Sequence, residues 1–234
     1  IKAQNVLEIG PGIGTITYEM AKIAKKVVAI EIDQTLIPIL KENLSEFENA
    51  KVIKQDILKT DLKGLVDNEF NGESFKVVSN LPYYITTPII EMLITTGLPC
   101  DDMTIMVQKE VAERMVASES DKEYSSLSVF IKFYTEAKVI ANLPKSVFIP
   151  QPKIDSTILN LKLRIYDENV NQDLLFKLIR AGFNKRRKTI LNSMSDVVEK
   201  DKLKEAFAKV DLKENLRAEN LSIDDFINLT NELS

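Results

Sequence analysis

The stretch N-V-L-E-I-G-P-G-I-G-T, residues 5–15, decides the fold class of this chain. Residues 5–9 are mostly apolar and strand-like, and apolar side chains then recur at helical spacing at Ile16, Met20 and Ile23. Between these two patterns stand three glycines, at positions 10, 12 and 14. A strand, a glycine turn and a helix bring backbone N–H groups close to a ligand at the helix N-terminus. The stretch therefore predicts a ligand-binding βα unit, although a tight turn without a ligand fits the glycines equally well.

The spacing of the glycines indicates which ligand such a turn receives. A dinucleotide site favours G-x-G-x-x-G, whereas this chain has G-x-G-x-G with Glu8 just ahead of it. That form is seen where S-adenosylmethionine binds, a cofactor that carries no pyrophosphate. Glu8, Gly10, Gly12 and Gly14 are accordingly the first candidate cofactor contacts.

Outward from this unit, the first half of the chain alternates short apolar runs with helical patterns, which is typical of βαβ units and a parallel sheet. We expect further strands at 26–30, 50–53, 76–79 and 103–107, and helices at about 34–44, from near Pro88, and at 110–117. Three longer strands are expected at 127–134, 137–143 and 156–165, the first two as an antiparallel pair that turns near Glu136. Beyond residue 169 the pattern is helical, so we predict domains at 1–167 and 168–234.

Composition places the 234-residue chain among globular proteins, with 44% hydrophobic residues, 28% charged residues and a net charge of −4. No apolar run reaches membrane-spanning length, and the single Cys100 fits a reducing cytosol. Histidine is absent, which excludes Ser-His and Cys-His nucleophile pairs and zinc sites built on imidazole. We therefore expect a cytoplasmic protein with no metal and no membrane contact, whose chemistry proceeds without histidine.

Two acidic residues follow the second and third predicted strands. Glu31 ends V-V-A-I-E, where a carboxylate can accept hydrogen bonds from both hydroxyls of a ribose. Asp56 stands in K-Q-D-I-L, where it can accept from an adenine amino group while Ile57 packs on the ring. Ligands of open α/β sheets bind beyond the carboxyl ends of the strands. The glycine turn and both acids thus predict one adenosine-shaped site, with Asp33 assigned to a structural or capping role.

The fourth predicted strand runs into N-L-P-Y-Y, residues 80–84, which a plain turn does not require. An exocyclic amino nitrogen is a poor nucleophile because its lone pair is delocalised into the base. The side-chain carbonyl of Asn80 and the main-chain carbonyl of Leu81 can accept from its N–H groups and direct the lone pair. Pro82 fixes the backbone, and Tyr83 offers a stacking face worth about 1–3 kcal/mol. Tyr84 is interpreted as a core residue, and a proline turn with two core tyrosines is the plain alternative.

These motifs together resemble the adenine-N6 dimethyltransferases of ribosomal RNA. The resemblance extends through V-Q-K-E-V-A-E-R-M-V-A at 107–117, Y-S-S-L-S-V at 124–129, F-I-P-Q-P-K-I-D-S at 148–156 and F-N-K-R-R-K-T-I at 183–190. The last two are similar to the small-subunit enzymes, which modify two adjacent adenosines near the 3′ end of 16S-type RNA. The erythromycin-resistance enzymes share N-L-P-Y but look different in the C-terminal region.

The resemblance implies a Rossmann-like methyltransferase fold, with a mostly parallel seven-stranded sheet and a small all-α C-terminal domain. It assigns cofactor contacts to Gly10, Glu31, Asp56 and Asn80, and the active-site turn to Asn80, Leu81 and Tyr83. It also makes Phe148 a second aromatic ring that sandwiches the target adenine, where sequence alone suggests a core phenylalanine. Members normally begin with a basic K-K-x-G-Q-N-F-L segment that helps enclose the cofactor. The sequence given starts almost at the first strand, so we expect cofactor affinity to depend on that segment.

A basic run, K-L-I-R-A-G-F-N-K-R-R-K at 177–188, contains no acidic residue. We interpret it as a helix with Leu174, Leu178 and Ile179 turned inward. Its cations are candidate phosphate contacts, although a solvated helix face is the plain alternative: Arg180, Lys185, Arg186, Arg187 and Lys188. Gln108, Lys109 and Arg114 are weaker candidates for the same surface. In the tail, Ser222 is expected to cap a helix whose apolar residues serve packing.

The sequence thus predicts a monomeric enzyme that dimethylates two adjacent adenosines of 16S-type RNA within a pre-30S particle, using S-adenosylmethionine, and that serves ribosome biogenesis. Because few side chains can read bases directly, shape is expected to select the site. Three alternatives remain: a nicotinamide oxidoreductase, a non-catalytic assembly checkpoint factor, and a large-subunit RNA methyltransferase. An oxidoreductase leaves N-L-P-Y unexplained, and the C-terminal motifs weigh against a large-subunit RNA methyltransferase.

Overall fold

The computed structural model describes residues 3–164, 166–167, 169–185 and 187–234. Two compact units make up the chain: residues 1–112 with 138–163, called here the sheet unit, and residues 113–137 with 164–234, called the helical unit. The predicted domain boundary between residues 167 and 168 stays a prediction. The packing adds that residues 113–137 fold together with the C-terminal helices rather than with the rest of the N-terminal segment.

Seven strands form the described part of the sheet, in the order β3-β2-β1-β4-β5-β7-β6. Their bounds are Asn5–Ile9 (β1), Lys26–Glu31 (β2), Ala50–Lys54 (β3), Phe75–Asn80 (β4), Cys100–Gln108 (β5), Thr135–Leu143 (β6) and Ser156–Leu163 (β7). Strands β1 to β5 pair in parallel, and β7 runs antiparallel to β5. All of β1 is buried, since helices cover both faces of a parallel sheet, and this accounts for its unbroken apolar run. The predicted mostly parallel, seven-stranded α/β fold is confirmed.

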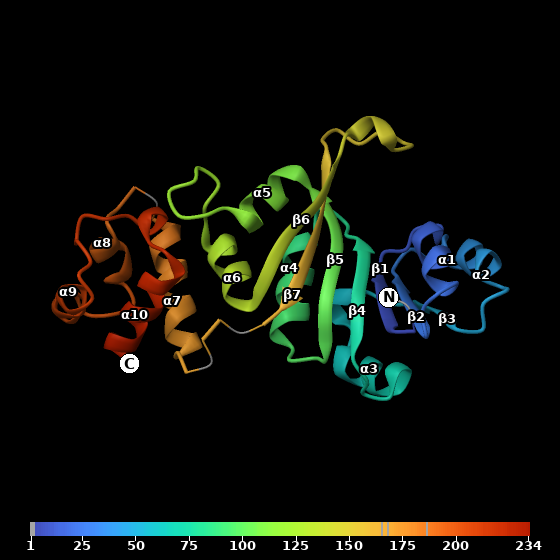
Figure 1. Cartoon of the computed structure of the whole chain (residues 1–234), viewed down its shortest axis with the longest axis horizontal. Helices are drawn as coiled ribbons and strands as arrows, with labels where there is room; N and C mark the ends of the chain where they lie inside the picture. The colour runs from blue at the N-terminus through green and yellow to red at the C-terminus, as the bar shows by residue number, and fades with distance from the viewer. Residues whose placement is uncertain (1–2, 165, 168, 186) are drawn as a thin grey trace. The chain divides into compact units, whose positions relative to one another are not determined.

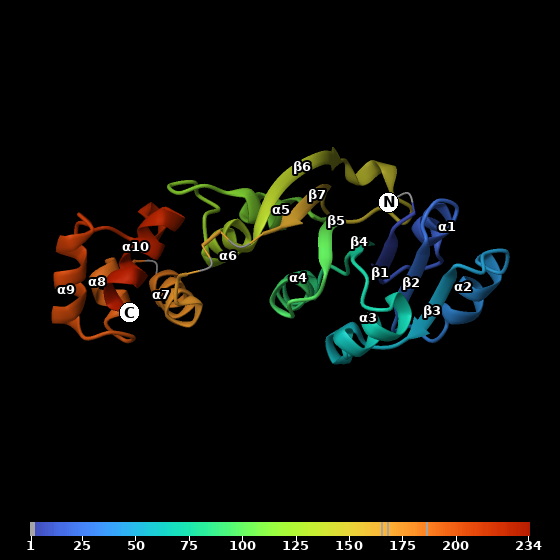
Figure 2. The ribbon, with the colours of Figure 1, turned by 60° about the horizontal axis from the view of Figure 1, so that its bottom comes forward.

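The helices of the sheet unit follow from the strand order. The chain passes from β1 through β2 to β3 in one direction across the sheet, and from β3 through β4 to β5 in the other. Crossovers of the same hand that run in opposite directions place their helices on opposite faces of the sheet. Accordingly α1 lies on one face and α3 and α4 on the other (Figure 2). The bounds are Thr15–Ala21 (α1), Ile37–Asn43 (α2), Ile57–Lys59 (η1), Leu62–Phe70 (α3), Thr86–Thr95 (α4) and Lys145–Val147 (η2). Helix α5, Lys109–Val116, begins in the sheet unit and ends in the helical unit. Helix α3, which Asp61 caps by accepting from Gly64 N, was not expected from the sequence.

The helical unit contains Ser126–Tyr134 (α6), Gln172–Asn184 (α7), Ile190–Met194 (α8), Lys200–Lys209 (α9), Ala218–Asn220 (η3) and Ile223–Leu233 (α10) (Figure 1). Leu178, Leu221 and Phe226 belong to its buried core, as the tail's expected packing role requires. Ser222 caps α10, since its Oγ accepts from Asp225 N at 3.1 Å. Across the described residues, no helix has both the length and the apolar character to cross a membrane.

The predicted strand at 127–134 is wrong, because these residues form α6. Val129, Phe130 and Ile131 are strand-favouring residue types, yet both Val129 and Ile131 are buried within a helix. When a helix is buried on most sides, its apolar run cannot be told from a strand by periodicity. The local signal was the capping box, in which Ser125 N donates to Ser128 Oγ at 3.0 Å. The expected antiparallel pair is therefore wrong too, and β6 instead neighbours β7.

Candidate functional site

A cavity of about 450 Å³ opens at the carboxyl ends of β1, β2 and β3. It is lined by five of the predicted cofactor contacts: Gly10, Gly12, Glu31, Asp56 and Ile57. Pro82, predicted as part of the active-site turn, also lines it, and sequence reasoning missed its other walls: Ile9, Ile30, Ile32, Asp33, Leu36, Gln55, Leu58, Tyr84 and Ile85. An apolar slot with two fixed carboxylates matches a nucleoside, which has a flat ring and hydroxyls that donate hydrogen bonds.

Glu31 is the best-anchored acid in this cavity, with only 6% of its surface exposed. Its Oε1 accepts from the backbone N–H groups of Ile32 and Asp33, each at 2.9 Å. Its Oε2 accepts from Gly12 N at 3.2 Å, which ties the carboxylate to the glycine turn. A carboxylate has about four acceptor positions, so about one, on Oε2, remains for a hydroxyl of a ligand.

Asp56 begins the 3₁₀ turn η1, where its Oδ1 accepts from Leu58 N at 3.1 Å. Its Oδ2 lies 3.6 Å from Lys59 Nζ, an exposed pair that contributes little stability. Ile32 and Leu58, which stand close in sequence to the two acids, are exposed by 58% and 41% although both are apolar. Large apolar side chains that are exposed at a cavity wall can pack against the faces of an adenine ring.

The glycine turn requires its glycines for different reasons. Gly10 and Gly12 have φ of +68° and +61°, the left-handed region that other residues rarely adopt. A Cβ on Gly10 would meet Pro82 Cγ at 3.4 Å, so the turn packs directly against the N-L-P-Y segment. Gly14 lies outside the cavity, and a Cβ there would approach Leu40 Cδ2 to 2.8 Å. Its predicted cofactor role stays a prediction, beside a clear packing reason.

Glu8 also lies outside the cavity lining, with 1% of its surface exposed. Its Oε2 accepts from Thr17 Oγ1 at 2.5 Å, which links β1 to α1. Burial raises the pKa of Glu8 from its ordinary value of 4.5 to about 7, opposed by the Thr17 hydrogen bond and assisted by the nearby charge of Glu31. The structure gives Glu8 a buried position between strand and helix, and its direct contact with a cofactor stays a prediction.

This raised pKa predicts a pH-dependent stability. Because the folded chain holds the Glu8 proton more tightly than the unfolded chain, the free energy of unfolding should fall as pH rises from about 4.5 to about 7, and level off above. Its total change should be on the order of 3 kcal/mol. Urea unfolding at several pH values measures it. Glu8→Gln, which keeps an acceptor for Thr17, should remove the slope; an unchanged slope in the variant would assign it to other groups.

A second cavity, of about 320 Å³, adjoins the first, since Pro82 lines both. Its walls are Asn80, Leu81, Pro82, Tyr83, Phe148, Ile149, Pro150 and Pro152. The structure thus brings together all five predicted catalytic residues, although Phe148 is far from the others in sequence. Within the described part of the chain, the exposed side-chain amide of Asn80 has no hydrogen-bond partner. It is therefore free to bind a ligand.

Tyr83 and Tyr84 lie in opposite environments. The Tyr83 hydroxyl lies 3.0 Å from the Oγ of the buried Ser156, which fixes its ring at the second cavity. Tyr84 was expected in the core, and this expectation is wrong, because 79% of its surface is exposed and it lines the first cavity. The turn at Pro82, whose carbonyl accepts from Ile85 N and Thr86 Oγ1, directs neighbouring side chains to different sides.

We expect Ser156→Ala to lower kcat/KM for the target base about fivefold, the value of one neutral hydrogen bond. Tyr83→Phe removes the same bond from the other end, so the double variant should be no worse than either single variant. Thr157→Val is a matched control, since Thr157 is equally buried but donates to Asn142 instead. Additive losses of kcat/KM in the double variant would show that Ser156 does not act through its hydrogen bond with Tyr83.

The basic run differs from its expected form, because α7 ends at Asn184 and residues 185–188 follow it. Arg180, Arg187 and Lys188 are exposed, Lys185 pairs with Asp196, and Arg186 lies outside the described residues. Leu178 and Ile179 are buried as expected, whereas Leu174 is only half-buried. The phosphate-binding role of these cations stays a prediction. So does that of Gln108, Lys109 and Arg114, which lie at the end of β5 and in α5.

The sheet order with its antiparallel β7, the glycine turn and the acid-lined nucleoside cavity define an S-adenosylmethionine-dependent methyltransferase. The residues present fit this cofactor, since a fixed carboxylate and an apolar slot suit its ribose and adenine. The model of the family "Ribosomal RNA adenine dimethylase" matches residues 2–234. The chain belongs to this family.

Similar proteins agree with this assignment. The chain is 47% identical over 235 residues to "Ribosomal RNA small subunit methyltransferase A" of Clostridioides difficile (strain 630), covering 98% of this chain and 81% of that protein. A protein of the same description from Bacillus pumilus (strain SAFR-032) is 45% identical over 236 residues, covering 97% and 81%. The crystal structure of a dimethyladenosine transferase from Plasmodium falciparum superposes with a TM-score of 0.85 at 28% identity, covering all of this chain and 91% of that one. The 23S rRNA methyltransferase ErmE shares the fold, with a TM-score of 0.76 at 24% identity, covering all of this chain and 92% of that one.

Proposed function

We propose that this rRNA adenine dimethyltransferase acts on two adjacent adenosines near the 3′ end of small-subunit rRNA, giving each two methyl groups on N6. The substrate of the enzyme is a pre-30S subunit, and the reaction serves ribosome biogenesis. Relatives at 43–47% identity described as small-subunit methyltransferases support the choice of subunit. The single observation that carries the proposed chemistry is the adjacency of the two cavities, which meet at Pro82.

Each cavity has a distinct task. When bound in the first, S-adenosylmethionine supplies a methyl group already activated on a sulfonium. Glu31 and Asp56 would hold its nucleoside part, while the glycine turn lies next to Pro82 and the second cavity. Tyr83 and Phe148 would stack on either side of the target adenine in that second cavity.

Asn80 would accept from the adenine amino group through its side-chain carbonyl, together with the main-chain carbonyl of Leu81. These acceptors favour a pyramidal nitrogen whose lone pair faces the methyl group. The alkylated nitrogen is very acidic and loses its proton without a strong base, which suits a chain that has no histidine. Catalysis is then mainly positioning of two bound groups.

The exposed cations Arg180, Arg187 and Lys188 support a phosphate-binding role for the helical unit. Contacts of this kind place a protein on structured RNA without reading its sequence, so particle shape would select the site. We propose that the enzyme acts as a monomer in the cytoplasm.

The test is methyl transfer from labelled S-adenosylmethionine to unmethylated small subunits, with naked RNA and large subunits as controls. The expected product is N6,N6-dimethyladenosine at two adjacent positions near the 3′ end of the small-subunit RNA. Methylation of large subunits instead would contradict the proposed substrate. Tight subunit binding without methyl transfer would favour the checkpoint role. Repeating the assay with the family's basic N-terminal segment added would then distinguish a binding-only protein from an enzyme that needs this segment for activity.

A further inference from the structure

The segment between β6 and β7, residues 144–155 and called here the arm, projects beyond the strands that it joins (Figure 1). It contributes Phe148 to the second cavity, together with the next two residues, Ile149 and Pro150. The arm is anchored at its base, where Asp155 Oδ1 accepts from Lys145 N at 2.9 Å and Asp155 O accepts from Lys109 N at 3.0 Å. Its side chains are therefore presented from a fixed frame.

Ile149 is the most exposed large apolar side chain of the described residues, at 101%, although it lines the mouth of the second cavity. Val147, on the other side of Phe148, is 60% exposed. Packing within the sheet unit accounts for neither. An apolar side chain beside a base-binding cavity offers a surface for a second base.

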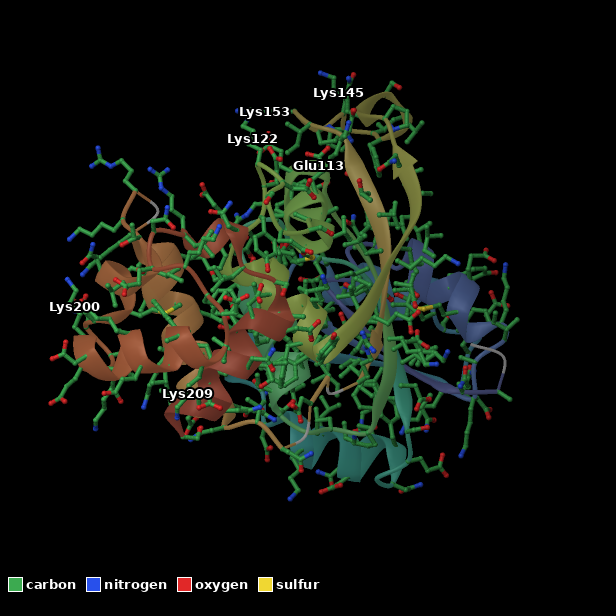
Figure 3. All side chains as sticks on the ribbon, turned by 60° about the vertical axis from the view of Figure 1, so that its left-hand side comes forward. Glu113, Lys122, Lys145, Lys153, Lys200 and Lys209 are labelled. Carbon is green, nitrogen blue, oxygen red and sulfur yellow. The ribbon has the colours of Figure 1, made fainter. Side chains whose placement is uncertain are left out.

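The charge of the arm also fits a nucleic-acid strand. Lys145 and Lys153 are exposed, and among the described residues neither has an ion pair. The one acid of the arm, Asp155, accepts from the backbone N–H of Lys145 through its Oδ1 and lies half-buried. Figure 3 labels both lysines at the end of the sheet from which the arm projects. Two free cations flanking an apolar tip complement a nucleic-acid strand, whose phosphates lie outside its bases.

We propose that the arm forms a site for the nucleotide adjacent to the target adenosine. Ile149 contacts the neighbouring base, and Lys145 and Lys153 bind the flanking phosphates. This inference rests on the proposed function, because two adjacent adenosines must enter the same second cavity in turn. A site for the adjacent nucleotide would hold the RNA strand in register while each of the two adenosines is methylated.

The test combines a protein change with a substrate change. Small subunits are assembled on RNA whose ligated 3′ segment carries either both adenosines or one adenosine beside an abasic site. Ile149→Ser should lower kcat/KM about tenfold on the normal substrate. The variant and the wild type should be equal on the abasic substrate, where no neighbouring base remains to be contacted. The dissociation constant for S-adenosylmethionine should not change in the variant, since Ile149 is no part of the first cavity.

Ile23→Ser is the matched control, because Ile23 is 50% exposed and lines neither cavity. For the lysines, Lys145→Gln and Lys153→Gln should each reduce the slope of log affinity against log salt by about 1, while Lys63→Gln on the exposed side of α3 should not. Equal losses by Ile149→Ser on both substrates would overturn the neighbour site, as would an unchanged rate on the normal one. Absence of methyl transfer by the wild type would overturn the proposed function instead, and the salt slopes would still test the arm.

Discussion

Asn80→Ala is expected to lower kcat for methyl transfer by about 10²–10³-fold, the loss typical of removing one preorganised polar group from an active site. The side chain of Asn80 lines the second cavity and has no partner among the described residues, so its removal disturbs no internal hydrogen bond. Binding of small subunits should survive, because the proposed phosphate contacts lie elsewhere. Single-turnover transfer to unmethylated subunits measures the loss directly.

Asn68→Ala is a suitable control, because Asn68 is an exposed asparagine on α3 and lines neither cavity. Since Asn80 is also a predicted cofactor contact, its variant should bind S-adenosylmethionine more weakly, but by less than tenfold. A loss of cofactor affinity as large as the loss in kcat would contradict the catalytic role. Full activity of the variant would remove Asn80 from the mechanism altogether.

The parts of the site that sequence predicted are those that local patterns determine. Three successive strands end at or just before the predicted cofactor contacts Gly10, Gly12, Glu31 and Asp56, and parallel strands bring their carboxyl ends to one edge of a sheet. Strand periodicity and the following polar residue were therefore sufficient to place them. Phe148 was assigned to the active site only from the family resemblance. Nothing in the sequence of residues 144–155 indicates that the arm lies next to the N-L-P-Y turn.

The errors arose where long-range packing decides the conformation. Tyr83 and Tyr84 are identical side chains in one turn, and Ser156, distant in sequence, holds the first of them at the second cavity. Residues 127–134 have strand-like composition, but burial within the helical unit makes a helix the packed state. Ile32 and Leu58 were overlooked because an exposed apolar residue is recognised only when the surface is known.

Glu31→Gln should weaken binding of S-adenosylmethionine and S-adenosylhomocysteine by about 10²-fold. The variant keeps an amide oxygen for Ile32 N and Asp33 N, but its NH₂ group takes the place of Oε2, which accepts from Gly12 N and has room for a ribose hydroxyl. The charge-assisted hydrogen bond from the ribose, worth about 1.5–3 kcal/mol, is therefore lost. The carboxylate already accepts from Gly12, Ile32 and Asp33, so its position is fixed before a ligand arrives. Titration calorimetry measures the dissociation constants, with Glu42→Gln on the exposed side of α2 as the control.

A ligand change separates the ribose contact from an effect on the glycine turn. Wild-type protein should bind a 2′,3′-dideoxy analogue of S-adenosylhomocysteine about 10²-fold more weakly than the parent compound, since the donor to Glu31 is missing. The Glu31→Gln variant has already lost this interaction, so the analogue should cost it little more affinity. If instead the two losses add, Glu31 acts mainly by holding Gly12 and its neighbours. The hydroxyls would then be bound by another group of the first cavity.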